Sequence, residues 1–189
     1  MEMNTNNKAN GNPKGENKEL VGYLFRHRFP WLALGLLGGM ATSVIISKYE
    51  TILAQDVRLA FFIPIIVYMS DAVGTQTETL YVRGLVKKHE GFYASLLKEI
   101  VLGLGLGAIF GVALGLFAGM WLHSPAIGLT TGLAMFISVA LAPILALIIP
   151  AVLVKERYDP AFGAGPFATI IQDLISILIY FAIATLIIF

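Results

Sequence analysis

The sequence predicts an all-α integral membrane protein with five transmembrane helices, and three observations support this prediction. Of the 189 residues, 57% are hydrophobic and only 13% are charged, a composition far from that of soluble domains. Five apolar stretches are long enough to cross a hydrocarbon core of about 30 Å, which takes about 20 helical residues. The Lys and Arg residues gather in the connections on one side of these stretches.

Composition and motifs also limit the class of function. The net charge of +1 gives no bulk basic character, so we expect no nucleic-acid partner. The chain has no cysteine, which excludes disulfides, thiolate metal sites and cysteine nucleophiles. It contains no nucleophile elbow, no HExxH motif and no phosphate-binding loop. We therefore expect no enzyme.

Three segments are predicted along the chain. Residues 1–19 are polar and almost free of apolar side chains, so they are predicted to form a disordered tail. Residues 20–29 are predicted to form a short amphipathic segment in the membrane interface, with Arg26 and Arg28 near its end. Residues 30–189 are predicted to form the membrane domain. Its five spans are expected at about 30–51, 57–86, 92–122, 125–154 and 160–189.

The distribution of Lys and Arg predicts how these spans are oriented. All 13 Lys and Arg residues except Lys48 and Arg58 fall before the first span, near the connection after the second, or after the fourth. Because connections rich in Lys and Arg stay in the cytoplasm, the amino terminus is expected in the cytoplasm and the carboxyl terminus outside. The expected location is the inner (plasma) membrane, in multi-pass form.

The fifth span carries a single formal charge, Asp173. A charged side chain at this depth costs about 2.5–3.5 kcal/mol on insertion scales, so it is usually found facing water, a partner or an ion. Helical spacing places Gly165, Thr169, Asp173, Ser176 and Tyr180 along one stripe. Two readings are open: a polar seam packed against a neighbouring helix, or part of an ion pathway.

The second span carries two more acids, Asp71 and Glu78. They are two helical turns apart and share a face with Gly74 and Thr75. Carboxylates surrounded by such residues favour hard cations, Mg²⁺ or Ca²⁺, over soft metals. Glu99 lies nearer the cytoplasmic end of the third span and is expected to pair with Lys98 at the interface.

Glycine recurs every fourth residue in the third span. Such a face lets two helix backbones approach closely, because helix association in lipid depends on packing. The run predicts either tight static packing against protein or a moving gate helix. The glycines stand at positions 103, 107, 111, 115 and 119.

Several blocks of residues resemble the MgtE-type family of magnesium channels and transporters, over about residues 28–188. The block in the fifth span is the most specific. The matching blocks are Pro30-Trp31 with Gly39-Met40; Leu59 to Pro64; Gly74, Gln76, Thr79-Leu80 and Arg83 to Leu85; Lys98-Glu99 with the glycine run; and Asp159 to Ala161, Pro166, Asp173 and Tyr180.

The resemblance implies a homodimer with an axial pore lined by spans two and five. Asp173 matches the family's ion-binding aspartate, which recognises Mg²⁺ largely through its water shell; Glu78, Asp71 and Thr169 are secondary candidates. The chain departs from the family's GNxGNQ motif, reading Asp-Ala-Val-Gly-Thr-Gln at residues 71–76. The resemblance covers the transmembrane domain only, without the family's amino-terminal and CBS sensor domains.

The expected function is therefore transport of a divalent cation, with Mg²⁺ first and Mn²⁺, Ca²⁺ or Co²⁺ as other ions. Membrane lipid is the expected surrounding. Two alternatives stay open at this stage. One is an exporter of divalent cations coupled to Na⁺ or H⁺, and the other is a non-transporting scaffold that packs against a partner through the glycine face.

Overall fold

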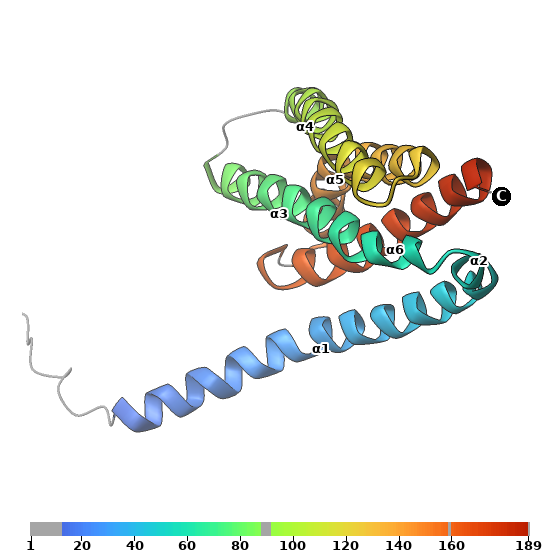
Figure 1. Cartoon of the computed structure of the whole chain (residues 1–189). Helices are drawn as coiled ribbons and strands as arrows, with labels where there is room; N and C mark the ends of the chain where they lie inside the picture. Colours follow the sequence, from blue (N-terminus) through green and yellow to red (C-terminus); the bar gives the residue numbers. More distant parts are fainter. Residues whose placement is uncertain (1–12, 88–91, 159, 189) are drawn as a thin grey trace, which may run out of the picture.

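The computed structural model describes residues 13–87, 92–158 and 160–188, which form helices joined by short turns. Within these described ranges, five helices are long and apolar enough to cross a membrane, which confirms the predicted all-α class and number of spans. The elements, seen in Figure 1, are α1 (Pro13–Ser47), α2 (Glu50–Gln55), the 3-10 helix η1 (Val57–Phe62), α3 (Ile63–Lys87), α4 (Phe92–Trp121), α5 (Pro125–Lys155) and α6 (Pro160–Ile188).

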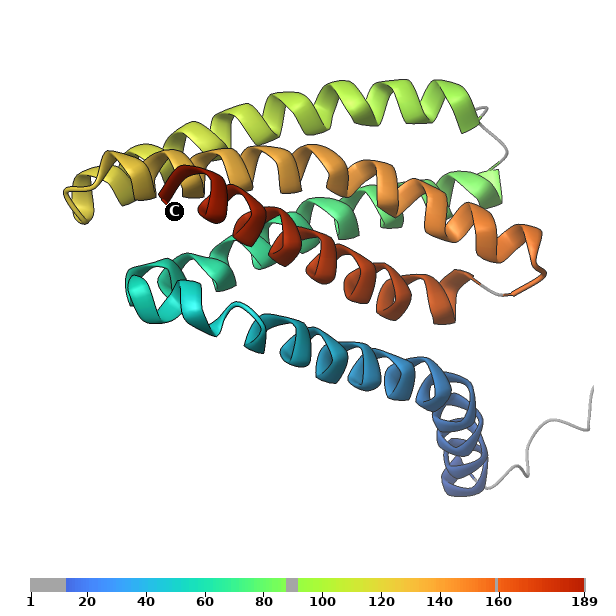
Figure 2. The same ribbon diagram turned by 90° about the vertical axis from the view of Figure 1, so that its right-hand side faces the viewer.

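The amino-terminal segment differs from the prediction. Helix α1 begins at Pro13, so residues 13–19 are helical where disorder is predicted; residues 1–12 lie outside the described part. Residues 20–29 belong to the same helix, which continues through Pro30 into the span. Proline lacks an N–H and its ring crowds the preceding turn, which bends a helix without necessarily ending it. Figure 2 shows α1 changing direction in its amino-terminal part.

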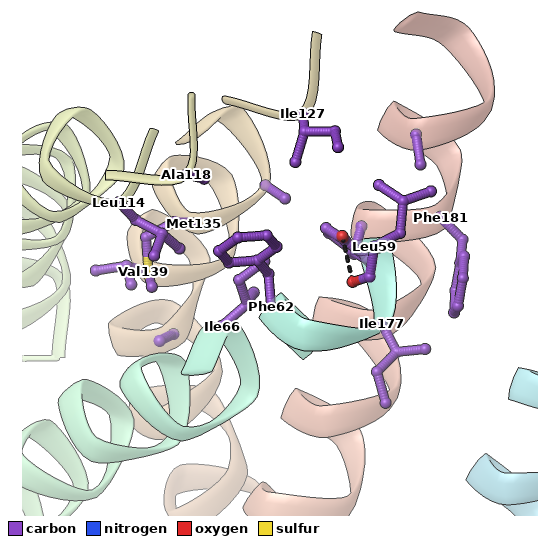
Figure 3. Close-up of a cluster of buried hydrophobic side chains, with 14 of the residues drawn as sticks. Leu59, Phe62, Ile66, Leu114, Ala118, Ile127, Met135, Val139, Ile177 and Phe181 are labelled. Carbon is purple, nitrogen blue, oxygen red and sulfur yellow. Dashed lines mark hydrogen bonds between the residues drawn. The ribbon is translucent and has the colours of Figure 1, made fainter. Parts of the chain in front are cut away.

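Helix α5 lies at the centre of the bundle, with α3, α4 and α6 packed around it (Figures 1 and 2). Phe62 and Ile66, at the junction of η1 and α3, point toward Met135 and Val139 of α5 (Figure 3). These side chains are almost completely buried. Burial of this kind in a membrane protein comes from close packing, because lipid tails are as apolar as the core.

The glycine face of α4 packs directly on the backbone of α5, which confirms that it faces protein. A Cβ built on Gly111 would lie 2.7 Å from the carbonyl oxygen of Gly132, and one built on Gly132 would lie 2.8 Å from that of Gly111. Gly115 and Gly128 form the same reciprocal contact. The surface that a scaffold would offer to another protein is therefore covered by α5 of the same chain.

Helix α1 stands apart from most of the bundle and packs mainly on α6 (Figure 1). At the contact, Gly38 leaves room for Ile170, whose side chain would meet a Cβ on Gly38 at 2.5 Å. Past the end of α1, Tyr49 stacks on Phe181 with ring centroids 4.3 Å apart. Helix α6 is consequently the element that joins α1 to the rest of the molecule.

The connection between α2 and η1 is held by Asp56. Its carboxylate accepts hydrogen bonds from the backbone N–H and the guanidinium of Arg58, at 3.1, 2.8 and 2.7 Å. The hydrogen bond from the Arg58 side chain holds the pKa of Asp56 below its ordinary value. This turn fixes the start of η1, which carries Leu59 into the core.

Candidate ion site on helices α3 and α6

Helices α3 and α6 run antiparallel and are joined by polar contacts along the predicted stripe of α6. The Tyr180 hydroxyl donates a hydrogen bond of 2.7 Å to the Leu59 carbonyl, and Ser176 lies 3.1 Å from Ser70, hydroxyl to hydroxyl. Ser176 and Tyr180 are both buried. For Ser176 and Tyr180, the interpretation as a packed polar seam is therefore confirmed.

Asp173 lies at the edge of this seam rather than inside it. It is half-buried and lines a groove of about 390 Å³ between α1 and α6. In the described part of the chain, no hydrogen-bond donor or basic side chain contacts its carboxylate. The other walls of the groove are Leu32, Gly35, Gly39 and Thr42 of α1 and Pro166, Thr169 and Ile170 of α6.

Asp71 faces the same region from α3. The Thr169 hydroxyl donates a hydrogen bond of 2.9 Å to its carboxylate. Asp71 is also near enough to Asp173 and to Glu78 for the carboxylate charges to interact. Asp71 and Asp173 lie within about a turn of the middle of their spans, which run over Val57–Gly84 and Ala164–Ile188.

Glu78 lies two turns from Asp71, toward the cytoplasmic end predicted for α3. One of its carboxylate oxygens would be 3.8 Å from a Cβ on Gly165, so Glu78 also faces α6. The structure thus brings all four predicted site residues, Asp173, Glu78, Asp71 and Thr169, to one pair of helices. Among the described residues, no three His, Cys, Asp or Glu side chains converge closely enough to hold a metal ion together.

Glu99 is not part of this group. It is expected at the interface with Lys98, but the structure buries it between α4 and α3, where the Thr77 hydroxyl donates to it at 2.8 Å. Thr77 and Glu78 are neighbours in the chain and point to different surroundings, because successive helical residues are about 100° apart. Glu99 therefore belongs to the α3–α4 contact, on the side of α3 that faces away from the candidate ion site.

Three residues behind the groove, Ser70, Gly74 and Gln172, are not among the site residues predicted from the sequence. Gln172 donates a hydrogen bond of 3.1 Å to the Ser70 hydroxyl and lies against Gly74. The sequence does contain a signal for Gln172, since an amide in an apolar span needs a hydrogen-bond partner inside the protein. The identity of that partner depends on how α3 and α6 are rotated, which the sequence does not reveal.

Comparison with known proteins places this arrangement in a family. A family model described as MgtE, divalent cation transporter, matches residues 63–183. That range holds the four candidate site residues, all of α3 and most of α6.

Three curated relatives are each named magnesium transporter MgtE. The protein from Enterococcus faecalis is 37% identical over 162 residues, which cover 84% of this chain and 36% of the relative. The protein from Bacillus subtilis is 34% identical over 161 residues, with 84% and 36% covered. The protein from Thermus thermophilus is 28% identical over 169 residues, with 86% and 37% covered.

The chain spans little more than a third of the length of these relatives, which are transporters and not enzymes by name. The family match nevertheless covers more than half of the chain, and the relatives align with most of it. The chain belongs to the MgtE family of divalent cation transporters.

Proposed function

We propose that this chain carries Mg²⁺ across the inner (plasma) membrane as a homodimer, with the ion passing between copies of α3 and α6. The observation that supports the proposal most directly is Asp173. It is a half-buried carboxylate near the middle of a span, and within the described residues it has no hydrogen bond or ion pair. Carboxylates at this depth usually have a function, because inserting a charged side chain into the membrane costs free energy.

The sparse arrangement of acids suits an ion that keeps its water. Mg²⁺ gives up its hydration shell reluctantly and is commonly bound through one or two carboxylates together with several waters. The groove beside Asp173, about 390 Å³ in volume, has room for an ion with bound water. Asp173 from each of two subunits would then face the hydrated ion from both sides and form the central site.

The remaining candidates mark a route along α3 and α6. Glu78 is the entrance acid on the cytoplasmic side, and Asp71 with Thr169 lies about 10 Å further along α3, at about 1.5 Å per residue. Asp173 stands beside this second position. In this proposal the amino terminus is cytoplasmic and the carboxyl terminus is outside.

The test is Mg²⁺ flux into liposomes that contain the purified parent or the Asp173→Asn variant. Asparagine keeps the size of aspartate and its hydrogen bonding but removes the charge. We expect Asp173→Asn to lower flux by about tenfold or more, since about 1.4 kcal/mol of lost ion binding gives a factor of ten. Glu156→Gln, an exposed acid in the connection after α5, is the matched control and should leave flux unchanged.

Two results would contradict the proposal. A folded Asp173→Asn protein that carries Mg²⁺ at the parent rate would remove Asp173 from the central site and make Glu78 the next candidate. Flux that requires an imposed Na⁺ or H⁺ gradient would replace passive conduction by the coupled mechanism.

A further inference from the structure

Gln172, the residue immediately before Asp173, is held in a buried position behind the groove. Only 2% of it is exposed, and its side-chain amide donates a hydrogen bond of 3.1 Å to the Ser70 hydroxyl of α3. A buried amide without a partner costs free energy, so this contact strongly favours one rotation of α6 over others.

Ser70 is the centre of the arrangement and is fully buried. Besides the Gln172 amide, its hydroxyl lies 3.1 Å from the Ser176 hydroxyl of α6. It donates its own proton to the Ser138 carbonyl of α5, at 3.1 Å. A hydroxyl has one donor and two acceptor positions, and all three are in use here. Ser70 therefore ties α6 to both α3 and α5.

Gly74, one turn after Ser70, provides the space that Gln172 occupies. A Cβ on Gly74 would overlap the amide oxygen of Gln172 and would lie 2.8 Å from the amide nitrogen. Alanine at this position would displace the amide from Ser70. The absent side chain of Gly74 and the bonded amide of Gln172 thus form one fitted contact.

The direction of Gln172 determines the direction of Asp173. Successive helical side chains project about 100° apart, so an amide directed at α3 leaves the next side chain at the edge of the α3–α6 contact. That edge is the groove beside α1 that Asp173 lines. Thr169, one turn earlier, is brought to Asp71 by the same rotation.

We propose that Gln172 is a positioning residue for the ion site. Held by Ser70 and seated on Gly74, it sets the rotation of α6 that directs Asp173 into the groove and Thr169 onto Asp71. The inference rests on the proposed function for the role of Asp173, but the geometry that it predicts can be measured without any ion.

The experiment uses the absence of cysteine from the chain. Asp71→Cys and Thr169→Cys are introduced together into the protein, and the rate of oxidative cross-linking is measured in the parent background. The rate is then measured with Gln172→Leu, or with Ser70→Ala, which removes a single oxygen. Tyr180→Phe is the control, because it removes a buried hydrogen bond from α6 to Leu59, outside the ion site.

We expect Gln172→Leu and Ser70→Ala to slow cross-linking by about threefold to twentyfold, the range set by one interhelical hydrogen bond in a membrane. Tyr180→Phe should change the rate by less than about twofold, because its bond lies far along α6 from Thr169. On the native Asp71 and Thr169 background, Gln172→Leu should also raise the Mg²⁺ concentration for half-maximal flux more than it lowers the maximal flux. Tyr180→Phe should not alter that concentration.

The outcomes separate the two proposals. If folded Gln172→Leu and Ser70→Ala proteins cross-link at the parent rate, Gln172 does not set the rotation of α6. Equal slowing in all three variants would also overturn the inference, because it would indicate general loosening. Selective slowing supports the positioning role even if Asp173→Asn still carries Mg²⁺, a result that would overturn the proposed function alone.

Discussion

Thr169 on α6 donates a hydrogen bond of 2.9 Å to the carboxylate of Asp71 on α3. This contact gives the two aspartates in the middle of the bundle different roles. Asp71 has part of its charge stabilised by a donor that also joins the two helices. Asp173 has no such donor among the described residues. We therefore expect Asp173 to interact with the ion more strongly than Asp71.

Asp71 and Glu78 should weaken the selectivity of the ion pathway for Mg²⁺ over Ca²⁺ and Mn²⁺. Added carboxylates favour ions that lose water readily, and Ca²⁺ accepts several carboxylate ligands where Mg²⁺ keeps its waters. In the parent, excess Ca²⁺ or Mn²⁺ should compete with Mg²⁺ flux, and Asp71→Asn with Glu78→Gln should reduce that competition. Liposome flux with mixed ions measures it. Mg²⁺ flux in the parent that is untouched by either ion would contradict the prediction.

Gly111→Leu should destabilise the protein. A side chain at Gly111 would meet the Gly132 carbonyl at 2.7 Å and the Phe136 backbone and side chain at 3.0–3.2 Å, so α4 and α5 would have to separate. Overpacking of this kind costs about 1–3 kcal/mol of unfolding free energy. Thermal unfolding in detergent measures the loss.

Gly105→Leu is the matched control for this prediction, because nothing lies within 4 Å of a Cβ at Gly105 on the same helix. It should melt like the parent. Equal melting of the two leucine variants would mean that the α4–α5 backbone contact contributes little to stability.

Gly39→Leu should block the groove without harming the fold. Gly39 lines the groove opposite Asp173, and nothing lies within 4 Å of a Cβ built on it. A leucine would therefore fit sterically while filling part of the space available to a hydrated ion. We expect Mg²⁺ flux to fall by about tenfold, equivalent to about 1.4 kcal/mol of added barrier.

The control is Gly22→Leu, also on α1 and also with nothing within 4 Å, but away from the groove. Flux and melting should both stay at parent values there. If Gly39→Leu likewise conducts at the parent rate, the ion does not use the groove beside α1.

Thr77→Val should reveal the buried bond between α3 and α4. Glu99 is a residue with only 7% of its surface exposed, and Thr77→Val would leave its carboxylate without the hydroxyl that donates to it at 2.8 Å. Losing a donor to a buried polar group costs about 1–3 kcal/mol. Thermal unfolding should register this loss, and Glu99→Met in the same protein should recover part of it.

Thr185→Val serves as the control for Thr77→Val, since the Thr185 hydroxyl donates its hydrogen bond within its own helix, to the Phe181 carbonyl. It should have a smaller effect on melting. A loss of thermal stability as large as that of Thr77→Val would show that the Thr77–Glu99 hydrogen bond contributes no more to stability than a hydrogen bond within one helix.

Helix positions in this chain follow from local properties and could be predicted closely. The third span is expected at 92–122 and α4 runs Phe92–Trp121; the fourth is expected at 125–154 and α5 runs Pro125–Lys155. Apolar length and flanking prolines decide these bounds without reference to the rest of the molecule. The exception is α1, because a proline such as Pro30 can either begin a helix or bend one.

Contacts between helices were less predictable, because they depend on how each helix is rotated against its neighbours. The glycine spacing of α4 predicts a close backbone contact, but nothing in it names Gly128 and Gly132 of α5 as partners. The acids of the candidate site were identified from their cost in lipid. The structure was needed to show that Asp71 accepts a hydrogen bond from Thr169, whereas Asp173 lines the groove without such a donor among the described residues.

The placement of α1 has a consequence for how the protein is made. Helix α1 is synthesised before the other helices described here, yet its main packing surface is α6, which is synthesised after all of them. Helices α4 and α5, by contrast, are consecutive and joined by a short turn, so they can associate as soon as both are inserted. Until α6 has been inserted, α1 lacks its main packing partner within the chain, and a ribosome stalled before Pro160 would leave it without that partner beside an assembled α4–α5 hairpin.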